Sequence, residues 1–200
     1  MHPATHFLLG WVVAETASLN RRERAAVAVS AVISDIDGIG YLAERLTFDS
    51  PNRLRWYTDY HHEIAHNLLF GVALAGCCFL MSRYAGGWKT DGNRENPERS
   101  PWMTALLSLA AFHTHILGDI AGSKGPDGSQ WAIPYLWPLS EWKWTWSGQW
   151  ELNAWPNFAI TLLALTVTFI LAVRRGYSPL EMISQRADHR FVETLRNRFH

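Results

Sequence analysis

Cysteine, charge and long unbroken apolar runs are all scarce in this 200-residue sequence. The two cysteines, Cys77 and Cys78, are adjacent within an apolar run, so the sequence contains no disulfide framework. Charged residues make up 18% of the chain, below the usual quarter, and eighteen Lys and Arg balance eighteen Asp and Glu. A chain without net charge has no overall field that attracts nucleic acid, and we expect no nucleic-acid partner.

A convincing strand pattern and a short internal repeat are also missing, which excludes a β fold and a solenoid. The 48% hydrophobic content excludes a disordered chain. The N-terminus lacks the basic region and small-residue cleavage site of a secretory signal, and we treat it as mature protein. These features predict one all-α domain over residues 1–200, a bundle of about six to seven helices.

Apolar periodicity and capping signals give the expected boundaries of these helices. Asp59 is the expected N-cap of a long helix, and Ser178-Pro179-Leu180-Glu181 matches a capping box. We expect loops in the polar segment 85–101 and in the irregular segment 121–156, which holds seven of the eleven Trp. The Trp-rich segment could be loop core, an interfacial anchor or the wall of an apolar substrate site. The predicted helices cover residues 3–18, 25–34, a short stretch ending near 45, 59–84, 100–120, 158–173 and an amphipathic terminal helix over 178–199.

Two apolar runs raise the question of a membrane. Residues 68–81 and 158–173 contain no charged side chain, but each is shorter than the roughly 20 residues that cross a bilayer. Arg83, Arg174 and Arg175 stand at their ends, as the positive-inside bias would place them. Composition alone leaves a soluble bundle and a membrane protein open. The terminal helix is basic, which is typical of a solvated face, of an anionic lipid surface or of a surface for a protein partner.

The strongest chemical signal is His and Asp inside an otherwise apolar helix. His115 and Asp119 are four residues apart, so they share one helical face about a turn from each other. A buried carboxylate costs several kcal/mol unless it is paired or coordinated. A divalent metal ion is a natural partner because His and Asp at this spacing can bind one ion.

Three further segments offer similar pairs. His62 and His66 share a face if their segment is helical, with His61 as an alternative to His62, and Asp35 and Asp37 can face one cation from a turn. His2 and His6 are again four residues apart. Each pair alone fits a hydrogen-bonded pair or a turn, but four in one chain predict a metal centre in the bundle core.

The order of these residues resembles a known family. Along the chain come Thr-His-Phe-Leu-Leu-Gly at residues 5–10, Ser-Asp-Ile-Asp at 34–37, His-x4-His-Asn at 61–67, His-x3-Asp at 115–119 and Trp-Pro-Leu-Ser at 137–140. This set resembles the YdjM-like family of bacterial inner-membrane-associated metal-dependent hydrolases, also described as LexA-binding. The resemblance covers residues 1 to about 140 and implies association with the inner membrane. It implies as the shared polar set His6, Asp35, Asp37, His61, His66, His115 and Asp119.

A more distant likeness is to zinc-dependent phospholipase C and the related single-strand nucleases, which are all-α and bind a cluster of zinc ions. Those enzymes have a further His and a second His-x3-acid motif, whereas only His189 and His200 follow Asp119 here. The likeness therefore implies one or two divalent ions, most simply Zn²⁺, rather than three.

Together these features predict a membrane-associated, metal-dependent hydrolase of a phosphoester, with an anionic lipid-linked or membrane-proximal substrate. One of Asp35 and Asp37 is an expected ligand, and the other, or Glu63, is the expected general base. His6 would complete a second site, and His2, His62 and His113 are secondary candidates. The alternatives are a non-enzymatic membrane-associated interaction protein with a structural metal site, and a soluble, cytoplasmic bundle with a buried polar network and no metal. The remaining expected ligands are His61, His66, His115 and Asp119.

Overall fold

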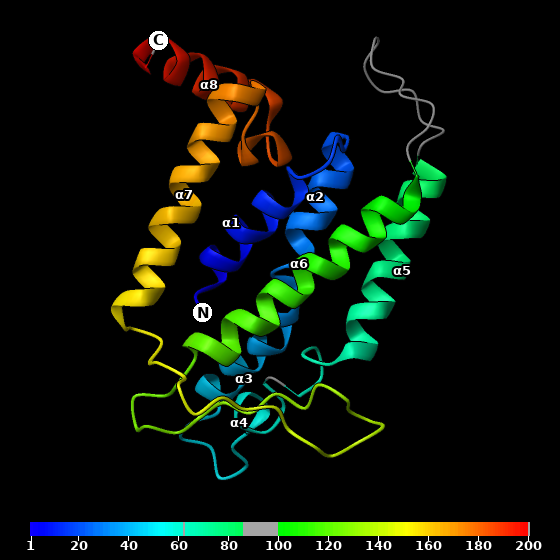
Figure 1. Ribbon diagram of the computed structural model, residues 1–200. Helices are drawn as coiled ribbons and strands as arrows, with labels where there is room; N and C mark the ends of the chain where they lie inside the picture. Colours follow the sequence, from blue (N-terminus) through cyan, green and yellow to red (C-terminus); the bar gives the residue numbers. More distant parts are fainter. Residues whose placement is uncertain (62, 86–99, 200) are drawn as a thin grey trace.

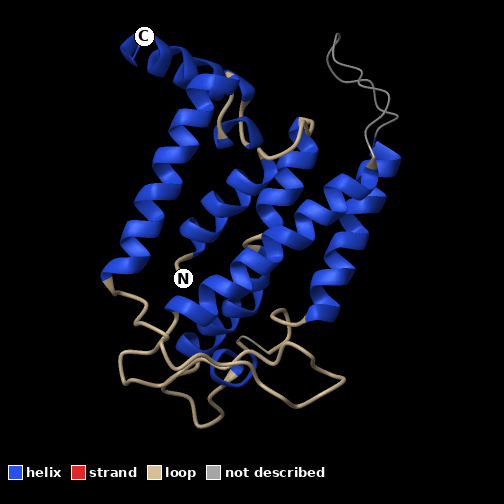
Figure 2. Cartoon of the chain, viewed as in Figure 1, coloured by secondary structure: helices blue, strands red, loops and turns tan. Residues whose placement is uncertain are grey.

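The computed structural model describes residues 1–61, 63–85 and 100–199, and this part of the chain contains helices and loops but no strand (Figure 2). The all-α prediction is therefore confirmed, with eight α-helices and two short 3-10 helices in the described residues. In chain order these are α1 (Pro3–Ala14), α2 (Arg21–Ser30), η1 (Ile33–Ile39), α3 (Gly40–Leu46), α4 (Trp56–Tyr60), α5 (Leu68–Ala85), α6 (Pro101–Gly122), α7 (Trp155–Arg175), η2 (Pro179–Met182) and α8 (Gln185–Phe199).

Five of these helices run alternately up and down the bundle in Figure 1. Helices α1, α5 and α7 rise from the lower end of the view, and α2 and α6 descend to it. The short elements η1, α3 and α4 and the segment 123–154 gather at that lower end, whereas η2 and α8 lie at the upper end. The N-terminus of α1 and the C-terminus of α6 thereby meet near the lower end.

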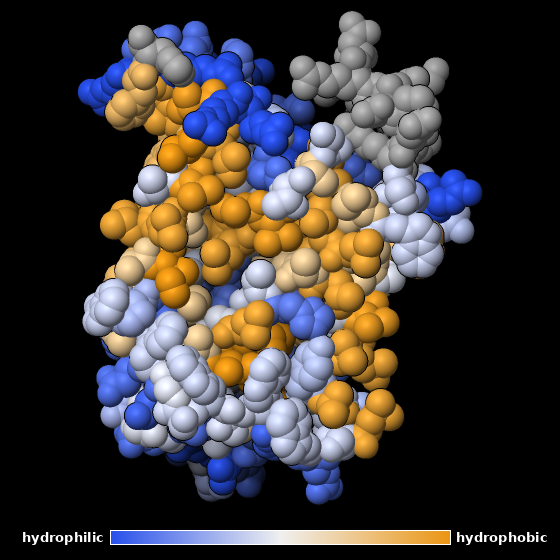
Figure 3. All heavy atoms as spheres, in the orientation of Figure 1, coloured by the Kyte–Doolittle hydropathy of each residue, from blue (hydrophilic) through white to orange (hydrophobic). Residues whose placement is uncertain are grey.

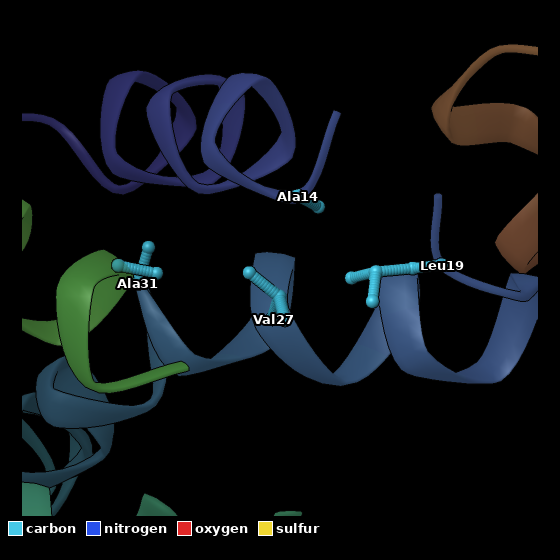
Figure 4. Packing of buried hydrophobic residues seen from close by; sticks show 5 residues of the cluster. Ala14, Leu19, Val27 and Ala31 are labelled. Atoms are coloured by element: carbon cyan, nitrogen blue, oxygen red, sulfur yellow. The ribbon is translucent and has the colours of Figure 1, made fainter. Parts of the chain in front are cut away.

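Small residues let α1, α2 and α6 pack closely. A buried cluster of Ala14, Leu19, Val27, Ala31 and Ala111 joins the three helices, and Figure 4 shows four of its members. Gly10 of α1 faces Ala31 so closely that a Cβ atom at residue 10 would lie 2.5 Å from the Ala31 Cβ. Because α1 and α2 are in such close contact, the polar side chains at their lower ends are held near α6.

The predicted helix 59–84 is wrong at its beginning. The chain is helical in α4 up to Tyr60, is not helical at His61 or in residues 63–67, and begins α5 at Leu68. Asn67 explains the break, since its side-chain oxygen accepts from the Phe70 amide and its side-chain nitrogen donates to the Ile64 carbonyl. This is an N-cap arrangement, so Asn67 and not Asp59 caps the helix.

Four other parts of the chain differ from the prediction. Helix α1 ends at Ala14 rather than near Ser18, and α2 spans Arg21–Ser30 because Asn20 and Glu23 form a capping box. The expected polar turn after residue 34 lies within the 3-10 helix η1. The terminal segment is not one helix from residue 178: Ser178 caps the short η2, and α8 begins at Gln185. The predicted loop 121–156 is confirmed for residues 123–154, and its two residues at each end belong to α6 and α7. Most of the predicted loop 85–101 lies outside the described residues.

Within the described ranges, two helices are long and apolar enough to cross a membrane, α6 and α7. The sequence pattern underestimated α7: the helix starts at Trp155, ends at Arg175 and is capped by Gly176, whose φ of +86° is left-handed. Its 21 residues span about 31 Å at 1.5 Å per residue, close to the thickness of a hydrocarbon core. A third span is formed if α2 and η1–α3, which are bent by 52°, are taken as one. Figure 3 shows a band of hydrophobic atoms around the middle of one face, with hydrophilic atoms above and below.

Candidate metal centre

Four side chains from three parts of the chain meet at the lower end of the bundle. Asp35 comes from η1, His66 from the connection before α5, and His115 and Asp119 from α6. One potential ligand atom from each lies within 4.8 Å of all the others, and three of the four residues are buried. Among the described residues this is the one group of three or more His, Cys, Asp or Glu side chains that could hold an ion.

The distances between these ligand atoms match those around a metal ion. His115 Nε2 lies 3.0 Å from His66 Nε2, 3.0 Å from Asp119 Oδ2 and 3.6 Å from Asp35 Oδ1, and His66 Nε2 lies 3.6 Å from Asp119 Oδ2. A tetrahedral ion with bonds of about 2.0–2.1 Å requires ligand atoms about 3.3 Å apart. The four atoms therefore lie where a single small divalent ion can contact them all.

The protonation of the two imidazoles supports the same assignment. His115 Nδ1 lies 2.8 Å from the Ala31 carbonyl oxygen, which can only accept, so Nδ1 carries the proton and Nε2 a lone pair. His66 Nδ1 is 3.1 Å from Asp37 Oδ2 and is fixed in the same tautomer. Two Nε2 lone pairs that face each other at 3.0 Å require a cation or a proton between them.

Without a metal ion, that cation is a proton on His66. Burial opposes its charge, but contacts with the Asp119 and Asp37 carboxylates raise the pKa of His66 to about 9. The same two carboxylates attract a divalent ion. Asp35 Oδ2, a buried carboxylate oxygen, has no hydrogen-bond partner in the described part of the chain, which leaves it available to the same ion. Burying this oxygen without a partner is costly, and the residues present therefore fit a metal ion.

Asp119 is held by groups outside the four-residue cluster. Its Oδ1 lies 3.1 Å from His6 Nε2, accepts from Ser123 Oγ at 2.9 Å and contacts the amino group of Met1. Oδ2 is thereby turned toward His66 and His115. His6 thus orients a candidate ligand, and the second ion that it was expected to bind stays a prediction.

Asp37 orients two imidazoles. Its Oδ2 accepts from His66 Nδ1, and its Oδ1 lies 2.8 Å from His61 Nδ1. The His61 ring also stacks on Tyr57, with 4.4 Å between ring centroids. Asp37 therefore contacts a candidate ligand directly, in the position from which a carboxylate fixes a metal-binding histidine, and His61 lies behind Asp37.

The remaining predicted residues lie elsewhere. Glu63 forms an ion pair with Lys143 and is not part of the cluster, so the structure does not bring this proposed base to it. His113 is on a different face of α6, where it contacts the Leu109 carbonyl and the Tyr135 hydroxyl at 2.7 Å each. His2 lies near Phe158, with 6.4 Å between ring centroids. His62 lies outside the described residues.

A cavity of about 700 Å³ opens beside the cluster. Asp35, Asp119 and His61 form part of its wall, together with Tyr57 and Lys124. Residues of the loop after α6, Trp131 and Leu152 also line this cavity. Two of the four candidate ligands, Asp35 and Asp119, thus border the cavity.

A family model described as YdjM inner membrane protein matches residues 1–185. The chain belongs to this family. The match extends beyond residue 140, where the sequence resemblance ended, and includes α7 and η2. Together with the two candidate spans, membership in the YdjM family places the protein in association with the bacterial inner membrane.

No curated protein and no solved structure matches this YdjM-family chain. The likeness to zinc-dependent phospholipase C therefore stays a prediction that rests on its short motifs. The candidate metal centre of this family member rests on its own geometry.

Sequence reasoning missed three groups around this centre: Ser123, the Met1 amino group and Tyr57. Ser123 follows Asp119 by four residues, so the same-face rule that paired His115 with Asp119 could have found it. Tyr57 and the Met1 amino group carry no comparable signal, because their contacts form only when α4 and the N-terminus fold against the site.

Replacing Asp37 with asparagine is expected to weaken metal binding by about 10–100-fold without abolishing it, the usual effect of losing a carboxylate behind a ligating histidine. The amide retains the shape of the carboxylate but cannot offer two acceptor oxygens to His61 and His66. Competition with a chromophoric chelator measures the affinity. Asp59→Asn is the matched control, since the Asp59 carboxylate is exposed and pairs with Arg55 at 3.5 Å. Equal metal affinities in the two variants would show that Asp37 does not support the metal centre.

Proposed function

We propose that the protein is a metal-dependent hydrolase that acts on a phosphoester of a lipid-linked or membrane-proximal molecule. The observation that carries this proposal is the contact between the candidate metal centre and the cavity, since Asp35 and Asp119 belong to both. A structural metal site has four protein ligands and is closed, whereas a catalytic site keeps a position open to substrate. The centre has four candidate protein ligands, as a structural site does, but its border with the cavity leaves room for a further ligand, and this favours the catalytic class.

A divalent ion in this centre, most simply Zn²⁺, would supply positive charge for the phosphoryl oxygens and would lower the pKa of a bound water to about 7. The residues of the chain bind the ion and orient its ligands. His66, His115, Asp119 and Asp35 hold the ion, while Asp37 and His6 fix the orientation of the ligands.

Two further side chains support the assignment to a phosphoester. Lys124 is on the cavity wall and offers a cation to an anionic substrate. His61 is on the same wall with its Nδ1 held by Asp37, so it is placed to transfer a proton to or from a group in the cavity. His61 thus takes the acid–base role for which the sequence offered Glu63 or an Asp.

Hydrolysis assays on the purified, detergent-solubilised protein test the proposal. Bis-p-nitrophenyl phosphate, p-nitrophenyl phosphate and vesicles that contain phosphatidic acid cover diesters, monoesters and lipid phosphates. We expect hydrolysis of at least one class, complete loss after chelation and recovery when Zn²⁺ is added back. Protein with a full complement of metal that hydrolyses none of the three would overturn the catalytic assignment and favour a structural site.

A further inference from the structure

The charged residues of the chain are divided unequally between the two ends of the bundle. We call residues 15–24, 82–85 and 174–199 the arginine end, and residues 33–61, 63–67 and 119–154 the site end. The arginine end has ten Arg against five Asp and Glu, and the site end has five Lys and Arg against ten Asp and Glu. Every Asp, Glu, Lys and Arg that the structure describes belongs to one of these two groups. A chain with no net charge is therefore strongly polarised.

Contacts between distant segments show that the arginine end is one surface. Arg24 of α2 pairs with Glu181 of η2 at 2.7 Å, Ser82 of α5 donates to Glu23 at 2.7 Å, and Arg196 of α8 donates to the Val173 carbonyl at 2.9 Å. The candidate metal centre lies at the other end of the same helices, where α6 ends and α7 begins (Figure 1).

The part between the two ends fits a lipid environment. The most apolar eighteen-residue window of α7 is only 22% buried inside the protein, and Leu162 and Leu163 are about two-thirds exposed. Trp155 opens α7 at the site end, and Trp102 opens α6 near the arginine end, with 78% and 65% of their side chains exposed. Exposed Trp at both ends of an apolar band is typical of the two interfaces of a bilayer.

We propose that the arginine end faces the cytoplasm and that the candidate metal centre opens on the periplasmic side of the inner membrane. Lys and Arg in short segments beside membrane spans remain on the cytoplasmic side, where anionic lipids add a further attraction. The ten Arg lie in the first turn of α2, near the C-terminal ends of α5 and α7, and on α8. The acidic site end carries no comparable excess of positive charge that would hold it in the cytoplasm.

This orientation deepens the proposed function and rests on it in one respect, the class of substrate. A phosphoesterase whose cavity opens to the periplasm acts on a phosphoester presented from the periplasmic leaflet of the inner membrane. Nucleotides in the cytoplasm cannot reach such a cavity. The orientation itself does not depend on catalysis.

Cysteine accessibility in intact cells tests the orientation. In a Cys77→Ser/Cys78→Ala background, Asn52→Cys places one thiol at the site end and Thr194→Cys places one on α8 at the arginine end. Both positions are exposed and uncharged, so neither substitution alters the charge of its end. The full chain is expressed in a Gram-negative host with a permeable outer membrane, and the cells are treated with a membrane-impermeant maleimide before and after the inner membrane is disrupted.

We expect Asn52→Cys to be labelled in intact cells and Thr194→Cys to be labelled only after disruption. The reverse pattern would overturn the orientation, and labelling of both or neither in intact cells would show that the two ends are not on opposite sides. Labelling requires no catalysis, so the two proposals can fail separately. An inactive protein with the expected labelling pattern would refute only the proposed function. An active protein with the reverse labelling pattern would refute only the orientation.

Discussion

His115→Ala is expected to abolish the stoichiometric binding of a divalent metal ion, whereas His113→Ala is expected to retain it. His115 Nε2 is within 3.6 Å of ligand atoms of the three other cluster residues, so its removal leaves no central nitrogen. His113 lies two residues earlier in the same helix, and its imidazole contacts Leu109 and Tyr135. The pair separates loss of a ligand from the general cost of removing an imidazole from α6.

Elemental analysis of the protein purified without chelator measures the metal content, with circular dichroism as the test of folding. His66→Ala is the second variant, since His66 lies in the non-helical connection before α5 and its loss does not disturb α6. We expect the wild-type protein to contain one ion per chain and both ligand variants to contain none. A full ion in folded His115→Ala and His66→Ala protein would exclude this ligand set.

The part of the centre that lies within one helix was predictable. The sequence placed His115 and Asp119 on one face of an apolar helix, and their ligand atoms are 3.0 Å apart. This succeeds because helical spacing is a local property and α6 is continuous from Pro101 to Gly122. The sequence did not predict that Asp35 would be a candidate ligand and that Asp37 would orient His66. Both were expected to face one cation, but η1 directs Asp35 to His115 and Asp37 to the far side of His66.

The segment 59–67 shows why the sequence did not predict the local structure around His66. Its composition favours helix, and the same-face argument for His62 and His66 depended on one. The break instead depends on two hydrogen-bonding groups, the Asn67 side chain and the Leu68 amide. The Leu68 amide donates to the carbonyl of Tyr135, at a distance of 2.8 Å, and Tyr135 lies in a loop far along the chain. A bond between residues this distant has no signature in local periodicity. His66 reached the centre despite the missing helix, because Asp37 and the cluster hold its ring from both sides.

The arginine end contains a buried ion pair whose disruption is expected to cost about 3–5 kcal/mol of unfolding free energy. Arg24 donates to both carboxylate oxygens of Glu181 at 2.7 and 2.8 Å and to the Leu19 carbonyl at 2.6 Å, and it lies over the Tyr177 ring. Arg24→Met retains the length of the side chain but leaves the Glu181 carboxylate in a buried site without its cation. Unfolding in detergent monitored by circular dichroism measures the loss.

Arg22→Met is the matched control, since Arg22 is exposed two residues away on the same helix, and we expect it to change stability by less than about 1 kcal/mol. The double variant Arg24→Met/Glu181→Leu should recover much of the loss, because the cost comes from the unpaired charge more than from the lost attraction. A double variant as unstable as Arg24→Met would show that packing around Arg24, and not its charge, stabilises this end.

The pH dependence of Arg24→Met provides an independent test of the same pair. Burial already raises the pKa of Glu181 and of neighbouring Glu15 above the ordinary value of 4.5, and Arg24 opposes this rise in both. Removing Arg24 should raise the two pKa values further. A carboxyl with a raised pKa in the folded chain binds its proton more tightly there than in the unfolded chain, so the folded state loses stability as the pH rises above 4.5. We therefore expect the deficit of Arg24→Met relative to the wild type to grow as the pH rises above 4.5, and a deficit independent of pH would contradict the charge-based explanation.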